Sequence, residues 1–231
     1  MTSTLPGLLI VWTNIPKELD YDFNDWYNRV HMRERILGVP GFVRGRRFFA
    51  FEGGPRYLAV YETRGTAVLH SEPYLALKRN YDPLSLRFVP HFLDTLKAAG
   101  EITARVGVAE GGVVALVPIA RMPGREDALR EWISEKLLPE LSAKHGVVAA
   151  WYGERDAAAV ASALADHPRK TDRILDAVLM VEAETNEDLN AAMPLLDWGR
   201  IQAQGGKPDA PAARFHTVYT LHLPPGTDAH R

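Results

Sequence analysis

A histidine lies on the apolar side of a predicted helix near the start of the chain. The stretch DWYNRVHMRERILGVPGFVRGRRF, residues 25–48, contains most of this helix. Side chains recur there at the i, i+3, i+4, i+7 and i+8 spacing of one helical face: Phe23, Trp26, Tyr27, Val30 and His31. An imidazole has an ordinary pKa of about 6.5, so His31 is the side chain best suited to proton transfer at neutral pH.

A second stretch, REWISEKLLPELSAKHGVVAAWYG (residues 130–153), repeats this pattern without the histidine. Trp132 aligns with Trp26 at an offset of 106 residues, and Leu137 then aligns with His31. Packing at that position therefore does not need an imidazole, which loses about 1–3 kcal/mol when it is buried without a hydrogen bond. A catalytic acid/base and a satisfied core histidine both remain interpretations of His31.

Three arginines crowd one predicted strand that follows the helix. Alternation along the strand sends Arg44 and Arg46 to one face and Arg47 to the other. An arginine that faces a pocket would hold a carboxylate or a phenolate, and we assign this role to Arg46. An arginine that faces outward would be a surface charge.

Other polar and aromatic residues complete the candidate site. Tyr61 joins His31 and Arg46 as a catalytic candidate, because a buried phenol needs a polar partner. Glu34 and Arg35 are interpreted as a solvated ion pair, with Glu34 as a group that orients His31 as the alternative. Candidates for substrate binding are Trp12, Asn14, Tyr27, Phe49, Tyr57, Tyr74, His91 and His216, with Tyr81 as a further lining residue. Core packing is the alternative for each aromatic residue.

The elements that must position these residues follow one order twice. The first half predicts a strand over 7–15, a helix that ends at 39–41, two strands within 42–63 joined by the turn Gly53–Pro55, a helix over 66–77 and a strand over 101–109. The second half predicts a strand over 111–120, a helix over 126–146, strands over 147–154 and 173–184, a helix over 186–198 and a strand over 214–223. Residues 155–172 form an insertion that predicts a short helix and a loop. Asp22 or a neighbouring residue, Thr66 and Thr185 are candidate helix caps.

The order β-α-β-β-α-β is that of a ferredoxin-like unit, so the chain predicts an α+β protein made of two such repeats. Their boundaries are 1–108 for the first repeat, which carries the His31 motif, and 109–231 for the second. Each sheet has helices on one face only, and the linker Ala109–Gly112 is short. We therefore expect the two sheets to pack face to face as one α+β barrel around an apolar cavity, rather than as two independent sandwiches.

Composition excludes several classes of function. The 231 residues are 46% hydrophobic and 24% charged, with a net charge of −2 and no cysteine. No basic block indicates nucleic acid or an anionic membrane as a partner, and thiolate chemistry and cysteine-based metal sites are excluded. No signal peptide or membrane span is evident, so a cytoplasmic location is expected.

Motifs for nucleotide, flavin or classical hydrolase chemistry are absent from the sequence. His216 and His222 share a strand face but lack nearby carboxylates, and His70 with Glu72 is a weaker pair, so no metal site is predicted. No cofactor is expected. A homo-oligomer is compatible with the sequence.

The stretch that begins at Trp26 resembles the EthD-like branch of the dimeric α/β-barrel superfamily. The matching residues are Trp26, Tyr27, Asn28, His31, Glu34, Arg35, Pro40, Gly41, Phe42, Arg46, Arg47 and Phe48. The chain departs from the pattern at Arg33, which is usually proline. The second stretch keeps Trp132, Pro139, Glu140 and Gly146 and loses the Tyr-Asn, His and Arg.

The resemblance implies that one chain here builds a barrel that relatives usually build from two. Such relatives include cofactor-free monooxygenases, isomerases, dehydratases and lyases that act on small, often aromatic or polyketide-like compounds, besides haem enzymes. We therefore predict a cofactor-independent lyase or isomerase of a phenolic or polyketide-like compound, with proton transfer by His31 and the release of a fragment such as formaldehyde, water or CO2. The alternatives are a cofactor-free monooxygenase and a non-catalytic binding protein for an aromatic ligand.

Overall fold

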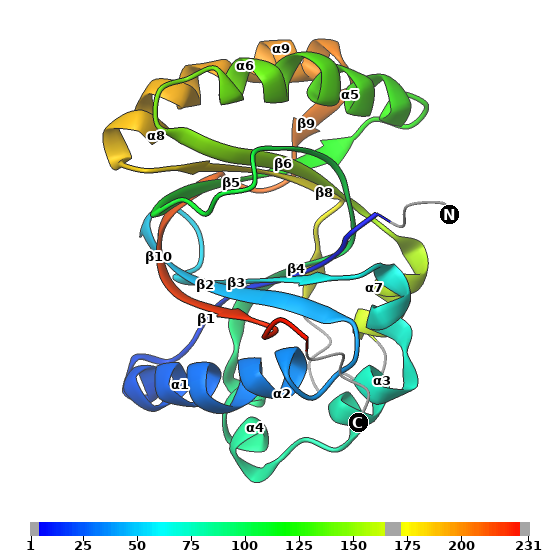
Figure 1. The fold of residues 1–231 in the computed structure, drawn as a ribbon, viewed down its shortest axis with the longest axis vertical. Helices are drawn as coiled ribbons and strands as arrows, with labels where there is room; N and C mark the ends of the chain where they lie inside the picture. The colour runs from blue at the N-terminus through cyan, green and yellow to red at the C-terminus, as the bar shows by residue number, and fades with distance from the viewer. Residues whose placement is uncertain (1–4, 165–171, 227–231) are drawn as a thin grey trace.

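Two sheets face each other between two outer layers of helices (Figure 1). The computed structural model describes residues 5–164 and 172–226. Its first unit contains β1 (Gly7–Asn14), α1 (Asp20–Trp26), a π-helical segment (Tyr27–His31), α2 (Met32–Ile36), β2 (Phe42–Glu52), β3 (Tyr57–Thr63), α3 (Glu72–Arg79), α4 (Pro83–Phe88) and β4 (Leu93–Val106). Short 3-10 turns cover Lys17–Leu19, Thr66–His70 and Val89–His91.

The second unit repeats the order with small additions. It contains β5 (Val113–Arg121), α5 (Glu126–Trp132), a π-helical segment (Ile133–Leu137), α6 (Leu138–Ser142), β6 (Val147–Arg155), α7 (Ala157–Leu164), β7 (Arg173–Ile174), β8 (Ala177–Ala183), α8 (Asn186–Ala192), α9 (Trp198–Ala203), β9 (Gly206–Pro208) and β10 (Ala213–His222). A 3-10 turn covers Met193–Leu195. The short strand β9 was not predicted, and the strand predicted over 173–184 is divided into β7 and β8. The predicted insertion forms α7, and its residues 165–171 lie outside the described residues.

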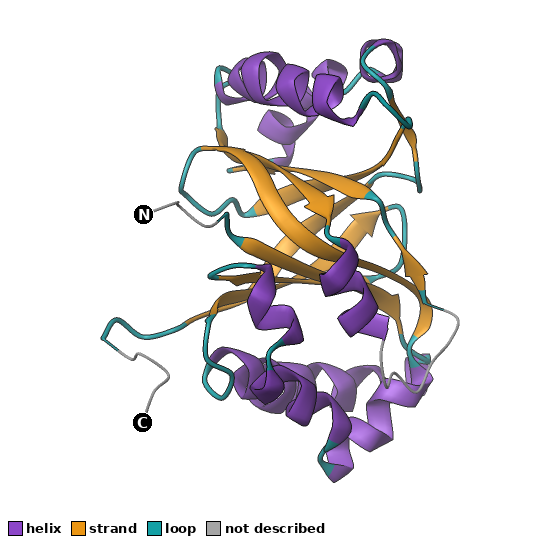
Figure 2. Ribbon diagram, turned by 90° about the vertical axis from the view of Figure 1, so that its right-hand side faces the viewer, coloured by secondary structure: helices purple, strands orange, loops and turns teal. Residues whose placement is uncertain are grey.

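Eight strands close into an antiparallel barrel in the order β1-β3-β2-β10-β5-β8-β6-β4, with β4 returning to β1. The two units are joined at two seams, where β2 pairs with β10 and β6 pairs with β4. Helices cover the outer face of each half of the barrel (Figure 2). The predicted α+β fold of two ferredoxin-like units is confirmed.

The barrel interior is packed with large side chains. Along β1, Leu8, Ile10 and Trp12 point into the interior, where they meet Trp151 and Phe215. The indole of Trp12 donates to the Pro55 carbonyl at 2.7 Å. Side chains therefore occupy the place between the two sheets where the sequence predicted a cavity, and that part of the prediction was wrong.

Element boundaries differ from the prediction where local sequence signals are weak. β4 begins at Leu93 rather than at residue 101, and α4 was not predicted. The Thr185 cap is confirmed, since its hydroxyl accepts from the Asp188 amide at 3.2 Å. The Asp22 and Thr66 caps were wrong: α1 already begins at Asp20, and neither α1 nor the Thr66–His70 turn has a side-chain cap. Within the described ranges, no helix has the length and hydropathy needed to cross a bilayer.

Candidate functional site

A buried cavity of about 40 Å³ lies between the first sheet and its helices. Because β1 alternates, Leu9 and Val11 face this helical layer while their neighbours face the barrel interior. The cavity is lined by Leu9, Val11, His31, Arg35, Tyr61, Tyr74, Lys78, Tyr81, Val89, Phe92 and Lys97. Its volume is room for a few water molecules, so a ring-sized ligand would need side chains to move.

His31 reaches the cavity from the end of a π-helical segment. Its side chain is 5% exposed, and its ring centroid lies 4.4 Å from that of Trp26 and 4.8 Å from that of Tyr27. π-helical turns inside α-helices occur frequently at functional sites. The second unit has the same local geometry over Ile133–Leu137, so the segment belongs to both units.

Arg35 follows His31 by one helical turn and lines the same cavity. Its guanidinium Nη1 donates to the His31 carbonyl at 2.8 Å, and its side chain also hydrogen-bonds Tyr74. The interpretation of Glu34 and Arg35 as a solvated pair was wrong, because Arg35 is 5% exposed and forms no ion pair with Glu34. The sequence signal for this placement was its i+4 spacing from His31 on the apolar face.

Phenol groups surround the guanidinium. The Tyr61 hydroxyl donates to the Tyr27 hydroxyl at 3.2 Å, and the Tyr61 ring centroid lies 6.0 Å from the Arg35 guanidinium carbon. Burial raises the pKa of Tyr61 well above 10 and the pKa of Tyr74 to about 12. Both phenols are therefore neutral at physiological pH. Tyr27 adjoins the cavity through these contacts without being part of its lining.

Two buried lysines on the cavity wall contact the insertion of the second unit. The Lys78 ammonium donates to the Ser162 carbonyl on α7, and the Lys97 ammonium pairs with Asp172 at 2.7 Å. The Lys97 and Asp172 side chains are 5% and 1% exposed. Neither lysine was predicted, because no local pattern shows that a distant insertion will cover it.

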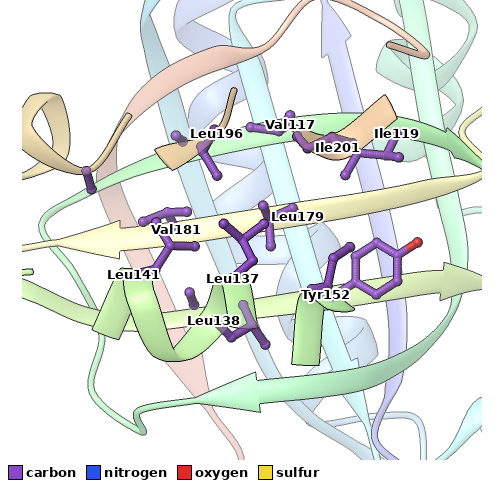
Figure 3. Close-up of a cluster of buried hydrophobic side chains, with 14 of the residues drawn as sticks. Val117, Ile119, Leu137, Leu138, Leu141, Tyr152, Leu179, Val181, Leu196 and Ile201 are labelled. Carbon is purple, nitrogen blue, oxygen red and sulfur yellow. The ribbon is translucent and has the colours of Figure 1, made fainter. Parts of the chain in front are cut away.

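The second unit fills the equivalent space with aliphatic side chains. Leu137 and Leu141 occupy the positions of His31 and Arg35 at the offset of 106 residues. Strand register places Val181 where the first unit has Tyr61, since Phe42 pairs with Thr63 and Val147 pairs with Ala183. These three aliphatic side chains belong to one fully buried cluster (Figure 3). The polar lining of the cavity is thus a property of the first unit.

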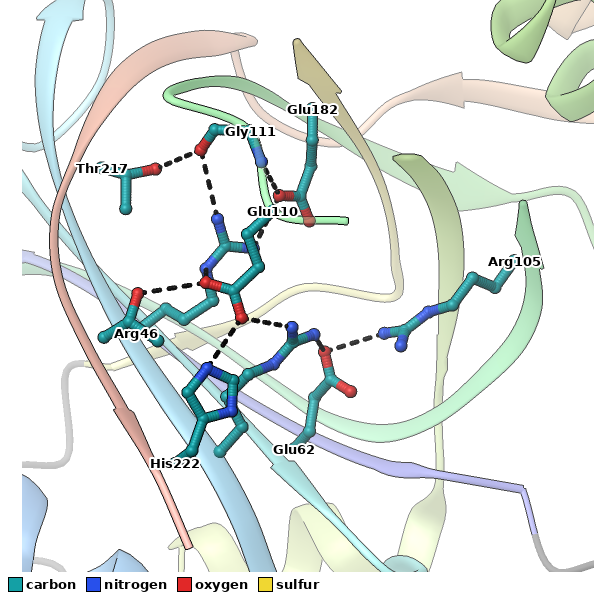
Figure 4. A network of polar contacts seen from close by, with 10 residues as sticks. Arg46, Glu62, Arg105, Glu110, Gly111, Glu182, Thr217 and His222 are labelled. Atoms are coloured by element: carbon teal, nitrogen blue, oxygen red, sulfur yellow. Dashed lines mark hydrogen bonds and ion pairs between the residues drawn. The ribbon is translucent and has the colours of Figure 1, made fainter. Parts of the chain in front are cut away.

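Arg46 lies away from the cavity, in a polar network that joins the two units (Figure 4). Its Nη1 pairs with Glu182 of β8 at 2.7 Å, and Glu110 lies 3.6 Å from its Nε. Arg44 pairs with Glu62 and Glu110 in the same network. The predicted alternation of the three arginines is confirmed, but the assignment of Arg46 to the pocket was wrong, because its strand face meets the acidic residues of the other unit.

The structure places Arg47 and two predicted binding residues in a second cluster beside α1. Arg47 is 1% exposed, donates to the Asn28 side chain at 2.7 Å and lies 4.3 Å from the Tyr27 ring centroid. Burial lowers the pKa of Arg47 to about 10. Phe49 and Tyr57 pack against each other there, with ring centroids 5.0 Å apart, and neither lines the cavity.

The remaining predicted residues also lie away from the cavity. Trp12 faces the barrel interior, and the Asn14 amide nitrogen donates to Asp94 at 3.1 Å at the end of β1. His91 is exposed. His216 is exposed and its ring centroid lies 4.5 Å from that of Phe51. Of the predicted set, the cavity lining contains His31, Tyr61, Tyr74 and Tyr81.

Comparison with known proteins identifies the fold. No protein-family model matches the chain, and no curated protein matches it. An anthrone oxidase-like protein superposes with a TM-score of 0.63 at 11% identity, covering 96% of this chain and 94% of that protein. A protein from Fusobacterium nucleatum subsp. nucleatum that carries the name "putative monooxygenase" superposes with a TM-score of 0.60 at 9% identity, covering 96% of each chain. The chain has the dimeric α+β-barrel fold.

A haem group does not fit the cavity in this conformation. A haem-binding protein from Thermus thermophilus superposes with a TM-score of 0.51 at 12% identity, covering 93% of this chain and 92% of that protein. The cavity of about 40 Å³ is far smaller than a porphyrin, and tyrosine and lysine side chains occupy its polar wall beside one histidine. Among the described residues, no group of three or more His, Asp or Glu side chains is arranged for a metal ion.

Proposed function

We propose that the protein is a small-molecule enzyme of the EthD-like branch, which transfers a proton to and from a phenolic or polyketide-like compound. One observation carries the proposal: an imidazole and a phenol, His31 and Tyr61, line a buried cavity that the second unit fills with Leu137 and Val181. The names of two structural neighbours, an anthrone oxidase-like protein and the protein named "putative monooxygenase", support a small-molecule function, and the polar lining of the cavity supports its location.

His31 is the proposed acid/base. It takes a proton from an acidic C–H or O–H bond of the substrate, and the electron pair left behind delocalises into the substrate ring. Return of the proton to another carbon gives an isomer, and expulsion of a small fragment gives a lyase product. The rings of Trp26 and Tyr27 hold the imidazole in place and exclude water from it.

A cofactor-free monooxygenase is the second candidate, favoured by the names of the structural neighbours. There the substrate carbanion formed by His31 reduces O2 directly. One CH2 group becomes a carbonyl, one O2 is consumed and one water is released, so the substrate supplies all the electrons. A non-catalytic binder of the same ring compounds is the third candidate.

The experiment compares His31→Asn with the wild-type chain on a panel of anthrones and polyhydroxylated phenols. We expect the variant to lose about 10²–10⁴-fold in kcat/KM, the usual contribution of a positioned general acid/base. His91→Asn is the matched control, because His91 is an exposed histidine of the same unit, and it should keep the wild-type rate. Product analysis measures turnover, and an oxygen electrode separates a monooxygenase from a lyase or isomerase. Ligand binding without turnover in the wild-type chain would support the binder instead.

A further inference from the structure

We propose that the cavity binds its ligand as an oxyanion of a small ring compound, and that Arg35 is the residue that selects the negative charge. The inference rests on the proposed function, because it names the substrate class of the same cavity. Phenolates, enolates and ring carboxylates share the required chemistry, namely charged oxygen atoms that accept hydrogen bonds from a planar guanidinium.

Among the residues that the structure describes, Arg35 is a buried cation without a carboxylate in ion-pair contact. Its side chain is 5% exposed, and no carboxylate of the described residues forms an ion pair with it. Its protein contacts include the His31 carbonyl, the Tyr74 side chain and the Tyr61 ring, and it attracts the neighbouring Glu34 without forming an ion pair with it. A guanidinium keeps its charge at physiological pH. Burying that charge unpaired is costly, and a bound anion would remove much of the cost.

The buried Arg46 and Arg47 and the half-buried Arg121 show how this chain balances such a charge elsewhere. Arg46 pairs with Glu182 at 2.7 Å, and Arg121 pairs with Asp176 at 2.8 Å. Arg47 lacks a carboxylate, but amide oxygens of Asn24 and Asn28 each accept from it at 2.7 Å. Arg35 alone among these four lines the cavity, which is where a ligand would meet it.

Packing requirements do not explain why residue 35 is an arginine. The second unit has Leu141 at the equivalent position, fully buried within its aliphatic cluster. A leucine would fill the same site without burying a charge. The neighbouring phenols do not supply the counter-charge either, because burial keeps Tyr61 and Tyr74 protonated. No other group among the described residues supplies an anion to Arg35, and we assign that part to a ligand.

Arg35 lies close enough to His31 for its positive charge to assist proton transfer. The guanidinium is bonded to the backbone of His31, and both side chains line one small cavity. Once the lining side chains move to admit a ring, an oxyanion held at Arg35 places that ring beside the imidazole. Negative charge that develops when His31 removes a proton is then stabilised by a fixed cation.

The test measures binding of two probes of similar shape to the full chain. 4-Nitrophenolate carries the charge, and its visible absorbance reports its ionisation in the bound state. 4-Nitroanisole is its neutral counterpart. We expect the wild-type chain to bind the phenolate at least about tenfold more tightly than the anisole, and Arg35→Met to lose about 10–100-fold for the phenolate, as for a charged hydrogen bond. Affinity of Arg35→Met for 4-nitroanisole should change by less than about threefold.

Arg29→Met is the matched control, because it removes the same charge from the same helical stretch at a side chain that is 79% exposed. It should bind both probes as the wild type does. If Arg35→Met does not fold, the wild-type chain alone decides. Equal affinity for the two probes, or no phenolate binding at millimolar concentration, overturns the inference.

The two proposals fail separately. His31→Asn should still bind 4-nitrophenolate within a few-fold of the wild type, since the anion contact belongs to Arg35. If Arg35 binds the phenolate but no substrate is turned over, the proposed enzymatic function is wrong and the proposed anion site still holds. If turnover needs His31 but the neutral probe binds as tightly as the phenolate, the proposed anion site is wrong and the proposed enzymatic function still holds.

Discussion

The difference between the two units is concentrated in a few side chains at matching positions. Leu137 and Leu141 replace His31 and Arg35, and Val181 replaces Tyr61, within helices and strands of the same order. A cluster of aliphatic side chains needs no hydrogen bonds, whereas each polar group in the first unit must be satisfied after burial. The polar set is therefore expected to lower stability in exchange for a reactive cavity, as functional sites commonly do.

Tyr74 offers a stability test of this polar set. Burial raises its pKa to about 12, above its ordinary value of 10, so the folded chain keeps a proton that the unfolded chain releases. The stabilisation that Tyr74 contributes is complete below pH 10 and is lost as the pH rises toward 12. The free energy of unfolding falls by at most about 3 kcal/mol over this range. Urea unfolding of Tyr74→Phe should therefore show a smaller alkaline loss than the wild type. Tyr21→Phe, at a residue that is 87% exposed, should leave the alkaline loss unchanged; equal loss in the wild type and Tyr74→Phe would contradict the assignment.

At the scale of elements, the sequence predicted the order of strands and helices but not the side of the sheet on which the cavity lies. The reason is visible in β1, where Leu8 and Ile10 face the barrel interior while Leu9 and Val11 face the helices. Both faces are apolar, so alternation separates two sets of residues without showing which set meets the helices. His31 was found because it interrupts an apolar stripe.

Long-range contacts were the second limit of the sequence. Arg46 carries the pattern of a ligand-binding arginine, but its partner Glu182 lies 136 residues away on another strand. The lysines of the cavity wall likewise depend on the insertion around α7, whose docking onto the first unit has no local signal. Arg35 could have been predicted from its spacing to His31, had its charge not indicated a solvent-exposed residue.

The buried pair between β4 and the end of the insertion gives an element-scale prediction. Lys97 and Asp172 are almost fully buried, so Asp172→Asn leaves the lysine charge without its carboxylate and should lower the free energy of unfolding by about 3 kcal/mol. The double variant Lys97→Met with Asp172→Leu should lose less than Asp172→Asn alone, because it buries no charge. Urea unfolding measures all three chains. A double variant that is less stable than Asp172→Asn would show that the insertion does not dock through this ion pair.

At the scale of the whole molecule, the barrel is held closed by two strand seams and by the polar network around Glu110. This residue lies in the linker between the units and accepts hydrogen bonds from Arg44 at 2.7 Å and Thr220 at 3.3 Å, while His222 lies 3.1 Å away (Figure 4). The network thus ties the linker to β2 and β10, the strands of one seam. Because these contacts form only when both units are in place, their loss should affect the whole barrel.

Lowering the pH should weaken the contacts that Glu110 makes with β2 and β10. Burial opposes ionisation of Glu110, but hydrogen bonds from Arg44 and attraction to Arg46 lower its pKa below the ordinary value of 4.5. The unfolded chain therefore binds a proton at higher pH than the folded chain. The stabilisation by Glu110 is complete above pH 4.5 and is lost as the pH falls through the pKa of the folded chain.

The Glu110→Gln variant should be less stable than the wild type at neutral pH and should lose less stability on acidification. Urea midpoints measured from neutral pH down to about pH 3 test this, with Glu135→Gln, an exposed glutamate, as the control. Parallel acid curves for the wild type and Glu110→Gln would mean that the linker carboxylate does not hold the two units together.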